Sequence, residues 1–233
     1  MILLNRPTSD SLNKLLVKKS PEEIISSIAN NYFKNKVVYV CSFGAESAII
    51  LHIISKISKN FPIIFINTLK LFRDTVFYKE NLIKSFGLNN CVDVYPDTGD
   101  VEQYDLDDNL WNQNQNKCCE IRKVKPLNKA LKGYEAWISG RKGYHNDERK
   151  GKNIVEFQNN KFIISPLIVK SYAEINNYFL KYKLLRHPLY NKGYLSIGCK
   201  NCTSKANENG KIRSGRWSNS TKTECGIHFD QKD

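Results

Sequence analysis

The chain of 233 residues lacks any run of about 18 apolar residues, the length a helix needs to cross the hydrocarbon core of a membrane. Its first twenty residues also lack the apolar stretch of a secretion signal, because only three consecutive apolar side chains follow the initiator methionine. We therefore expect no membrane segment and a cytoplasmic protein whose thiols stay reduced. Internal repeats and low-complexity tracts are absent as well, and folding needs no disulfide framework.

Acidic side chains are scarce relative to basic ones. The 23 aspartates and glutamates are outnumbered by 36 lysines and arginines, which leaves a formal net charge of +13. Such a balance favours polyanionic partners, a phosphorylated or sulfated ligand, or an acidic protein. The heavy use of lysine, asparagine and isoleucine throughout the chain favours a simpler explanation, a biased composition with solvated charged faces, so the charge alone decides little.

Short apolar runs alternate with amphipathic runs along most of the chain. We predict strands over residues 37–42, 62–67, 91–95 and 135–139, and one more over 161–165. Helices are predicted from Ser20 to about Phe33, directly after residue 47, over 72–86 and over 171–182, with serine caps at the first and last of these. This alternation predicts an α/β fold in which helices cover both faces of a mostly parallel sheet.

Seven cysteines fall into three groups. Cys41 and Cys91 lie in predicted strands, where a free cysteine packs as a small hydrophobe. Cys118-Cys119 and Cys199-Lys200-Asn201-Cys202 are two close pairs, and four thiolates suit a tetrahedral zinc site or an iron–sulfur cluster. Adjacent thiols reach separate iron atoms more easily than one small ion, so the pattern favours iron–sulfur. We expect the first pair to open a helix, where backbone amides lower thiol pKa values.

The seventh cysteine, Cys225, lies in a polar segment that we call the C-terminal tail, residues 204–233. Few aliphatic side chains occur there, which is typical of a flexible or conditionally ordered segment. An exposed cysteine next to glycine is accessible to a partner protein, and the cations nearby favour its thiolate. Taken without these neighbours, a lone cysteine in a tail is usually incidental.

A candidate anion site follows the first predicted strand, in the loop Ser42-Phe43-Gly44-Ala45-Glu46-Ser47. A strand, a tight loop and a helix bring backbone amides and a helix N-terminus to one point, where an anion is stabilised. The loop does not have the Gly-Lys-Ser/Thr ending of a Walker motif. An ordinary strand-to-helix turn explains the same pattern.

Five blocks, in order, resemble the assimilatory adenylyl-sulfate reductases of the bacterial cluster-containing type. They are SFGAES, CCEIRKVKPL, WISGRK, HPLYNKGYLSIGCKNCT and GRW followed by KTECGIH, and together they extend roughly over residues 37–228. The resemblance implies an adenine nucleotide alpha-hydrolase-like fold, related to the PP-loop ATP pyrophosphatases. It also implies one 4Fe-4S cluster, held by Cys118, Cys119, Cys199 and Cys202.

The resemblance implies a reaction as well. In the family, the cysteine of the ECGxH motif, here Cys225, attacks the sulfate sulfur of adenylyl sulfate. AMP leaves, a cysteine S-sulfonate remains, and thioredoxin or glutaredoxin releases sulfite from it. Cations would neutralise the phosphosulfate and the charge that grows on AMP. The substrate-binding residues implied are Ser42, Phe43, Gly44, Lys123, Arg149, Arg213, Arg216 and His228, the last of which either holds the anion or orients Cys225.

The chain departs from the family pattern at three places. Asn67-Thr68-Leu69 stands where such reductases usually have Asp-Thr-Gly, while Asp97-Thr98-Gly99 follows the third predicted strand and is interpreted as a turn. Gly143 and His145 stand where the family often has arginine and glutamine. We expect a weaker affinity or a rearranged loop.

Other functions remain open. A 3′-phosphoadenylyl-sulfate reductase keeps the fold, although family members that use that nucleotide tend to lack the four thiols. A PP-loop RNA-thiolating enzyme usually carries Ser-Gly-Gly-x-Asp-Ser where this chain has SFGAES, and a zinc-stapled nucleic-acid-binding module conflicts with the strand-helix alternation. We therefore expect no nucleic-acid and no membrane partner, and leave a homo-oligomer open.

These features predict three parts. Residues 1–34 form an N-terminal helical segment, residues 35–203 form the nucleotide-binding and iron–sulfur domain, and residues 204–233 form the mobile tail that carries the catalytic cysteine.

Overall fold

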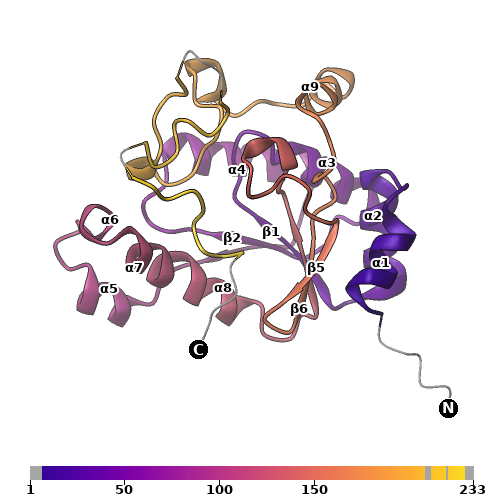
Figure 1. Cartoon of the computed structure of the whole chain (residues 1–233), viewed down its shortest axis with the longest axis horizontal. Coiled ribbons are helices and arrows are strands. Elements are labelled where there is room, and N and C mark those ends of the chain that lie inside the picture. Colours follow the sequence, from indigo (N-terminus) through magenta and orange to yellow (C-terminus); the bar gives the residue numbers. More distant parts are fainter. Residues whose placement is uncertain (1–6, 208–210, 219, 229–233) are drawn as a thin grey trace.

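The computed structural model describes residues 7–207, 211–218 and 220–228. Its centre is a six-stranded sheet in the order β3-β2-β1-β4-β6-β5 (Figure 1). The strands are β1 (Val37–Cys41), β2 (Ile63–Ile66), β3 (Cys91–Val94), β4 (Ala136–Ser139), β5 (Val155–Gln158) and β6 (Lys161–Ile164). All neighbours pair in parallel except β5 and β6. The predicted α/β fold with a mostly parallel sheet is confirmed, and so are the five predicted strands.

Both faces of the sheet are apolar, which explains why its strands appear in the sequence as continuous apolar runs. Successive side chains of a strand point to opposite faces. In β1, Val37, Tyr39 and Cys41 belong to the larger core, whereas Val38 belongs to a smaller core on the other face. The central strands therefore offer apolar side chains on both faces of the sheet, and helices pack against each face.

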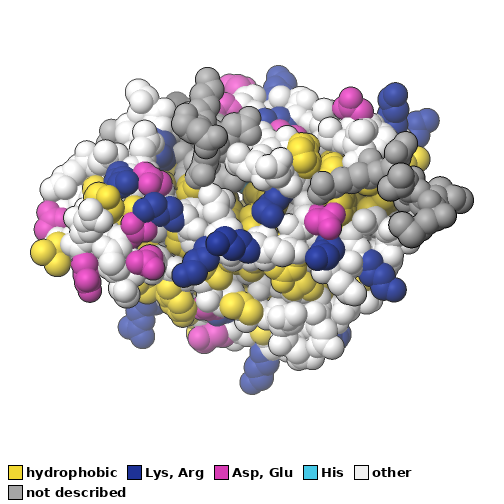
Figure 2. Space-filling view, turned by 90° about the horizontal axis from the view of Figure 1, so that it is seen from below, with side chains coloured by type: hydrophobic (Ala, Val, Ile, Leu, Met, Phe, Trp, Pro, Cys, Tyr) yellow, Lys and Arg dark blue, Asp and Glu magenta, His cyan; other side chains and the backbone are white. Residues whose placement is uncertain are grey.

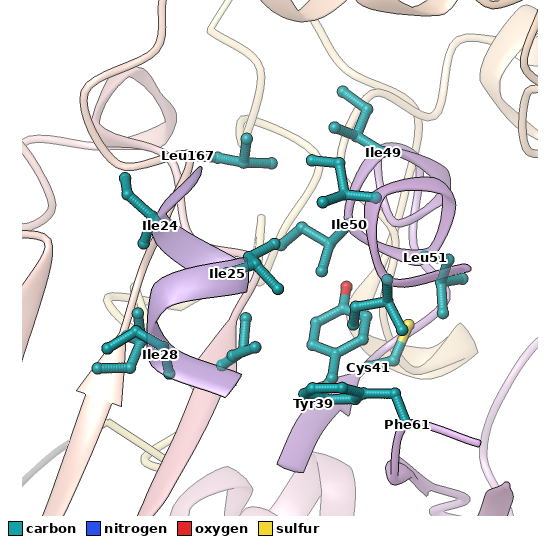
Figure 3. Close-up of a cluster of buried hydrophobic side chains, with 14 of the residues drawn as sticks. Ile24, Ile25, Ile28, Tyr39, Cys41, Ile49, Ile50, Leu51, Phe61 and Leu167 are labelled. Carbon is teal, nitrogen blue, oxygen red and sulfur yellow. The ribbon is translucent and has the colours of Figure 1, made fainter. Parts of the chain in front are cut away.

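Helices from both ends of the chain cover the face of the larger core. They are α1 (Ser9–Leu16), α2 (Pro21–Ser27) with a π-helical turn η1 (Ile28–Tyr32), α3 (Ala48–Ile57), α4 (Arg73–Phe86) and α9 (Tyr172–Lys181). Figure 3 shows Ile25 of α2 and Ile50 of α3 pointing toward each other beside Tyr39 of β1. The predicted caps Ser20 and Ser171 form capping boxes at α2 and α9.

Shorter helices lie on the side of the smaller core, at the lower left of Figure 1. They are α5 (Thr98–Tyr104), α6 (Leu110–Gln113), α7 (Gln115–Cys119), the π-helical turn η2 (Glu120–Val124) and α8 (Lys125–Ala130). Leu127 of α8 and Leu131 pack against Val38 and Trp137 of the sheet. The expectation of a turn at Asp97-Thr98-Gly99 is wrong, because Asp97 caps α5 by accepting hydrogen bonds from the backbone of residues 99 and 100.

The antiparallel edge strand β5 was not predicted. It forms a hairpin with β6 through Asn159 and Asn160, which both have positive φ, as a tight hairpin turn requires. Its open edge is covered by α1: Asn13 donates to the carbonyl of Val155 at 2.8 Å and accepts from its amide at 2.9 Å. One side chain thus satisfies both backbone groups of Val155 on the open edge, which limits the room for pairing with another chain.

The described part of the tail folds back onto the segment before it. Thr203 and Arg216 form an isolated β-bridge, and the amide of Ser204 donates to the carbonyl of Gly215 at 2.7 Å. Three short 3-10 turns, η3 (Gly143–His145), η4 (Tyr190–Lys192) and η5 (Lys200–Cys202), complete the regular structure of these ranges. The division into residues 1–34, 35–203 and 204–233 and the mobility of the tail stay predictions. Residues 1–6, 208–210, 219 and 229–233 lie outside the described residues.

Lysine and arginine do not cover the surface evenly. On the face seen from below, basic side chains cross the middle, and acidic ones gather toward the end that carries α5 (Figure 2). Within the described ranges, no helix combines the length and the apolar character that crossing a membrane requires.

Candidate active site

A cavity opens where the chain order of the strands reverses. β1 and β4 are neighbours, but β2 and β3 lie on one side of them and β6 on the other, and open α/β sheets bind ligands at such a point. Residues at the ends of β1 and β4 line it, among them Cys41, Ser42, Ser139 and Gly140. Its volume of about 190 Å³ is below the roughly 300 Å³ at which ligand pockets begin, and residues of the tail form part of its lining.

The predicted anion loop borders this cavity with two of its three assigned residues. Ser42 and Gly44 line it. The side chain of Phe43 instead lies fully buried in the core, edge-to-face with Phe65 at 5.1 Å between ring centroids, and its φ is +47°. Phe43 therefore anchors the loop, and any contact with a ligand has to come from its backbone.

Four predicted cations line the same cavity from three separate segments. Lys123 comes from η2, Arg149 from the loop after β4, and Arg213 and Arg216 from the tail. Burial alone would lower the pKa of Lys123, but the nearby thiols of residues 199, 225 and 119 raise it above its ordinary value. Burial, and then the charge of Arg149, lower the pKa of Arg213 to about 10. A cavity with this lining favours an anion.

Arg216 reaches its place because of a glycine beneath it. A Cβ added at Gly198 would lie 2.1 Å from Nη1 of Arg216, so only glycine leaves room for the guanidinium. Nε of Arg216 donates to the carbonyl of Cys202 at 3.1 Å, and the group lies over the ring of Trp217. These contacts connect the tail with the second cysteine pair.

The cysteine of the tail is only partly buried and lines the cavity. Cys225 follows Glu224, whose carboxylate accepts hydrogen bonds from Arg149 at 2.6 and 2.8 Å. Three residues further on, the ring of His228 stacks on Trp137 with 5.0 Å between centroids, and its Nε2 lies 3.4 Å from Oγ of Ser139. Contacts on both sides therefore hold the thiol over the cavity.

His228 is half-buried, but its Nδ1 is shielded from solvent, and several cations lie nearby. Burial, and then the charges of Arg141 and Arg149, hold the pKa of His228 well below its usual range, so the imidazole is neutral. Its Nδ1 is one of the buried polar atoms of the described chain that have no hydrogen-bond partner. An unpaired nitrogen beside an anion pocket is suited to bind a ligand or a water molecule.

The two cysteine pairs converge beside the cavity. Cys118 and Cys119 end α7, Cys199 precedes η5 and Cys202 ends it, and all four are free thiols. The charge of Cys199 affects the pKa of each of the other three, which indicates that they lie close together. Oγ1 of Thr68 lies 3.3 Å from Sγ of Cys199. Within the described residues, no three cysteine, histidine or acidic side chains form a ligand set for a single metal ion.

The expectation that Cys118-Cys119 opens a helix is wrong. Asn114 caps α7, and the pair stands at its far end, where the chain continues into η2. Burial raises the pKa of Cys118 to about 12 and, as the largest cause, also raises that of Cys119. Cys199 differs: burial is outweighed by Lys123 and by the hydrogen bond from Thr68, which lower its pKa.

A buried ion pair holds the helix of the first cysteine pair. Arg122 donates to one carboxylate oxygen of Asp105 from Nε at 2.9 Å and from Nη2 at 2.5 Å, and its Nη1 donates to the carbonyl of Thr68 at 3.0 Å. Asp105 also accepts from the amide of Leu110 at 2.7 Å. Three segments, the loop after β2, the start of α6 and η2, are thereby fixed to one another.

Sequence reasoning missed a cluster of polar side chains at the cavity, centred on Glu46. Glu46 of the SFGAES loop pairs with Lys142 at 2.5 Å and with Nε2 of His145 at 2.9 Å, and accepts a hydrogen bond from Tyr144. Burial, and then the Lys142 charge, lower the pKa of His145 to about 4. Glu46 belongs to the SFGAES block and Lys142 to the WISGRK block, but the sequence does not indicate that the two side chains pair.

Glycine at position 143 has a steric cause. Its amide donates to the carbonyl of Ile168 at 2.8 Å, and an added Cβ would lie 2.7 Å from that oxygen. A side chain at position 143 therefore does not fit this backbone, and the weaker affinity or rearranged loop stays a prediction. Leu69 adopts a φ of +62° with most of its side chain exposed.

Comparisons with known proteins identify the family of the chain. Residues 36–205 match the model of the phosphoadenosine phosphosulfate reductase domain. An adenosine 5′-phosphosulfate reductase of Mesorhizobium japonicum is 36% identical over 94% of this chain and 86% of its own length. The protein of the same name from Bacillus mycoides is 36% identical over 88% and 89%.

Solved structures give the fold independently. The phosphoadenylyl-sulfate reductase of Candida auris superimposes with a TM-score of 0.72 and 25% identity, over 84% of this chain and 96% of its own. An FMN adenylyltransferase of Candida glabrata superimposes with a TM-score of 0.57 at 12% identity, over 95% and 83%, and is informative for the fold alone. The expected PP-loop-related nucleotide fold is confirmed.

Proposed function

The chain belongs to the phosphoadenosine phosphosulfate reductase family, and from this membership we propose that it reduces adenylyl sulfate to sulfite and AMP. The reaction is part of sulfate assimilation, in the cytoplasm, and supplies sulfite for cysteine biosynthesis. The observation that carries the proposal is that Cys225 faces a cavity lined by Lys123, Arg149, Arg213 and Arg216. A sulfur nucleophile beside an anion pocket is what transfer of a sulfonyl group requires.

The residues of this chain have distinct tasks in the reaction. The thiolate of Cys225 attacks the sulfate sulfur, and the bond between sulfur and the phosphate oxygen breaks, so that AMP leaves with the electron pair. The guanidinium and ammonium groups stabilise the charge that develops on the leaving phosphate. A dithiol protein, thioredoxin or glutaredoxin, then attacks Cys225 Sγ, sulfite departs, and the dithiol is oxidised to a disulfide.

We propose that Cys118, Cys119, Cys199 and Cys202 hold one 4Fe-4S cluster. The chemistry of the donor set supports it: four free thiols converge, Thr68 and Lys123 bond to one of them, and Arg122 fixes their helix. When bound, such a cluster supplies thiolate-ligated iron and sulfide beside the anion pocket. Iron and acid-labile sulfide in anaerobically purified protein test this; zinc without sulfide contradicts it.

Cys225→Ser tests the assigned nucleophile. We expect it to abolish sulfite release from adenylyl sulfate and to leave AMP binding within about twofold, because the cations remain. Cys91→Ser, at a partly buried thiol of β3, is the matched control and retains turnover. Sulfite release by the Cys225→Ser protein at the wild-type rate would refute the role.

The 3′-phosphorylated nucleotide is the second candidate substrate. The Candida auris structure is named for it, but the relatives at 36% identity are named for adenosine 5′-phosphosulfate. Steady-state competition between the two nucleotides distinguishes them: we expect kcat/KM to be higher for adenylyl sulfate. The reverse order would assign the chain to the second reaction.

A further inference from the structure

Glu224, the residue before Cys225, is an acidic side chain of the tail that has several hydrogen-bond partners. Its two oxygens accept from Nε and Nη2 of Arg149 at 2.6 and 2.8 Å, which is a bidentate pair, and one of them accepts from Asn146 at 3.1 Å. Nη2 of Arg213 lies 3.5 Å from the same carboxylate. The side chain is 8% exposed, so water screens these contacts little.

Glu224 occupies the guanidinium groups that the proposed function assigns to the substrate. Arg149 uses two nitrogens on this carboxylate, and its Nη1 lies 3.4 Å from Nδ1 of His145. Nη2 of Arg213 donates to the carbonyl of Thr223 at 2.6 Å. A phosphosulfate that binds these arginines in the closed form has to replace a carboxylate of the protein.

The remaining contacts of the tail strengthen this closed form. Thr223 donates a hydrogen bond to Glu148, and Ser220 donates to Gln115 at 2.8 Å. Closure leaves a cavity of about 190 Å³, small for a nucleotide. We therefore expect a nucleotide to displace the tail when it binds, and the charged contact that has to be broken is the one made by Glu224.

We propose that Glu224 is an internal anionic ligand of the site, which closes the tail over the nucleotide-free cavity and competes with the substrate anion for Arg149 and Arg213. The inference rests on the proposed function. Its consequence is an exchange: the carboxylate neutralises the two arginines while the cavity is empty, and an arriving phosphosulfate releases it. Exchange of one anion for another couples nucleotide binding to tail opening.

Glu224→Gln separates competition from a merely structural role. Glutamine keeps the shape but removes the charge, so we expect AMP to bind at least about fivefold more tightly in calorimetry of the anaerobically purified full chain. In the absence of AMP, trypsin should cleave after Lys222 faster than in the wild type, as followed by mass spectrometry. A residue that only supported the pocket would instead weaken AMP binding when altered.

Two further variants make the result specific. Asp147→Asn removes one exposed charge from the loop that carries Arg149, and should change AMP affinity by less than about twofold through long-range effects. Glu224→Asp retains the charge, and its affinity should lie between those of the wild type and Glu224→Gln. If the wild type binds AMP but Glu224→Gln binds it no more tightly, or its tail is cleaved no faster, the inference fails and the proposed function stands. If the wild type does not bind AMP, both fail.

Discussion

Leu69 has a backbone conformation that suits glycine. Its φ is +62°, in the left-handed region where a side chain costs roughly 1–2 kcal/mol, and 60% of the residue is exposed, so it gains little from burial. The neighbouring Thr68 is held by Arg122 and Cys199. The chain therefore accepts local strain at this loop.

We expect Leu69→Gly to raise the free energy of unfolding by up to about 1 kcal/mol, since relief of the strain exceeds the extra entropy that glycine gives the unfolded chain. Urea unfolding measures it. Leu106→Gly is the control, because Leu106 is 84% exposed and is not among the residues with positive φ. That change should be neutral or destabilising. Equal effects of the two substitutions would contradict the strain at Leu69.

Asp97 and Asn114 illustrate why single residues were misread. Each is a side-chain cap that starts a short helix, and neither is preceded by an apolar-periodic run. Capping depends on whether the side chain meets the free amides of the next turn. That geometry is decided by how the following helix packs. The sequence therefore indicated a turn at Asp97, and it indicated a helix start at Cys118-Cys119 instead of at Asn114.

Two ion pairs connect the segment of α5 with the helix of the cysteine pair, and they differ in burial. Asp105 and Arg122 are 0% and 3% exposed, whereas Lys125 is 44% exposed and pairs with Asp100 at the surface. Loss of one partner of a buried pair leaves an uncompensated charge, and an exposed pair contributes little. The buried pair therefore determines how firmly η2 and α7 are held.

Asp105→Asn should lower the free energy of unfolding by roughly 3–5 kcal/mol, since Arg122 keeps its charge without a partner. Asp100→Asn, which removes the same group from the exposed pair, should cost less than about 1 kcal/mol. Denaturant unfolding of both variants gives the comparison. Similar losses would show that burial of the pair is not what matters.

The elements follow from the sequence to different degrees. Five strands and the helices with serine caps have a clear period and cap, and they are confirmed. The edge strand β5 is missed because its burial is irregular and its support comes from Asn13, 142 positions away. Helix α1 was predicted only as part of the helical segment 1–34 and not as a separate helix, although Thr8 and Ser11 form its capping box.

The positive charge of the whole molecule acts together with the cavity. The net charge is +13, and six lysines and arginines line one pocket, among them the four predicted cations, so the field attracts an anionic substrate from a distance. Basic side chains also cross the face shown in Figure 2. Long-range attraction is screened by salt, whereas contacts between buried groups are screened much less.

KM for adenylyl sulfate should therefore rise several-fold between about 0.1 and 1 M salt, as the Debye length falls from about 10 to 3 Å, while kcat changes little. Sulfite release under steady-state conditions measures both constants. Binding of neutral adenosine over the same range is the control and should stay nearly constant. A KM that does not depend on salt would show that the net charge does not attract the substrate from a distance, and that only the cations in contact with it contribute.

The sequence alone determined the fold class, the layers of helices and the two cysteine pairs. Apolar period, serine caps and thiol spacing are local features, which neighbouring residues fix before the chain folds. Tertiary structure decided which side chains meet: Phe43 turned into the core, Glu46 paired with Lys142, and Glu224 with an arginine 75 positions away. Pairs of this kind form because packing and exclusion of water bring distant charges together, and no local pattern records them.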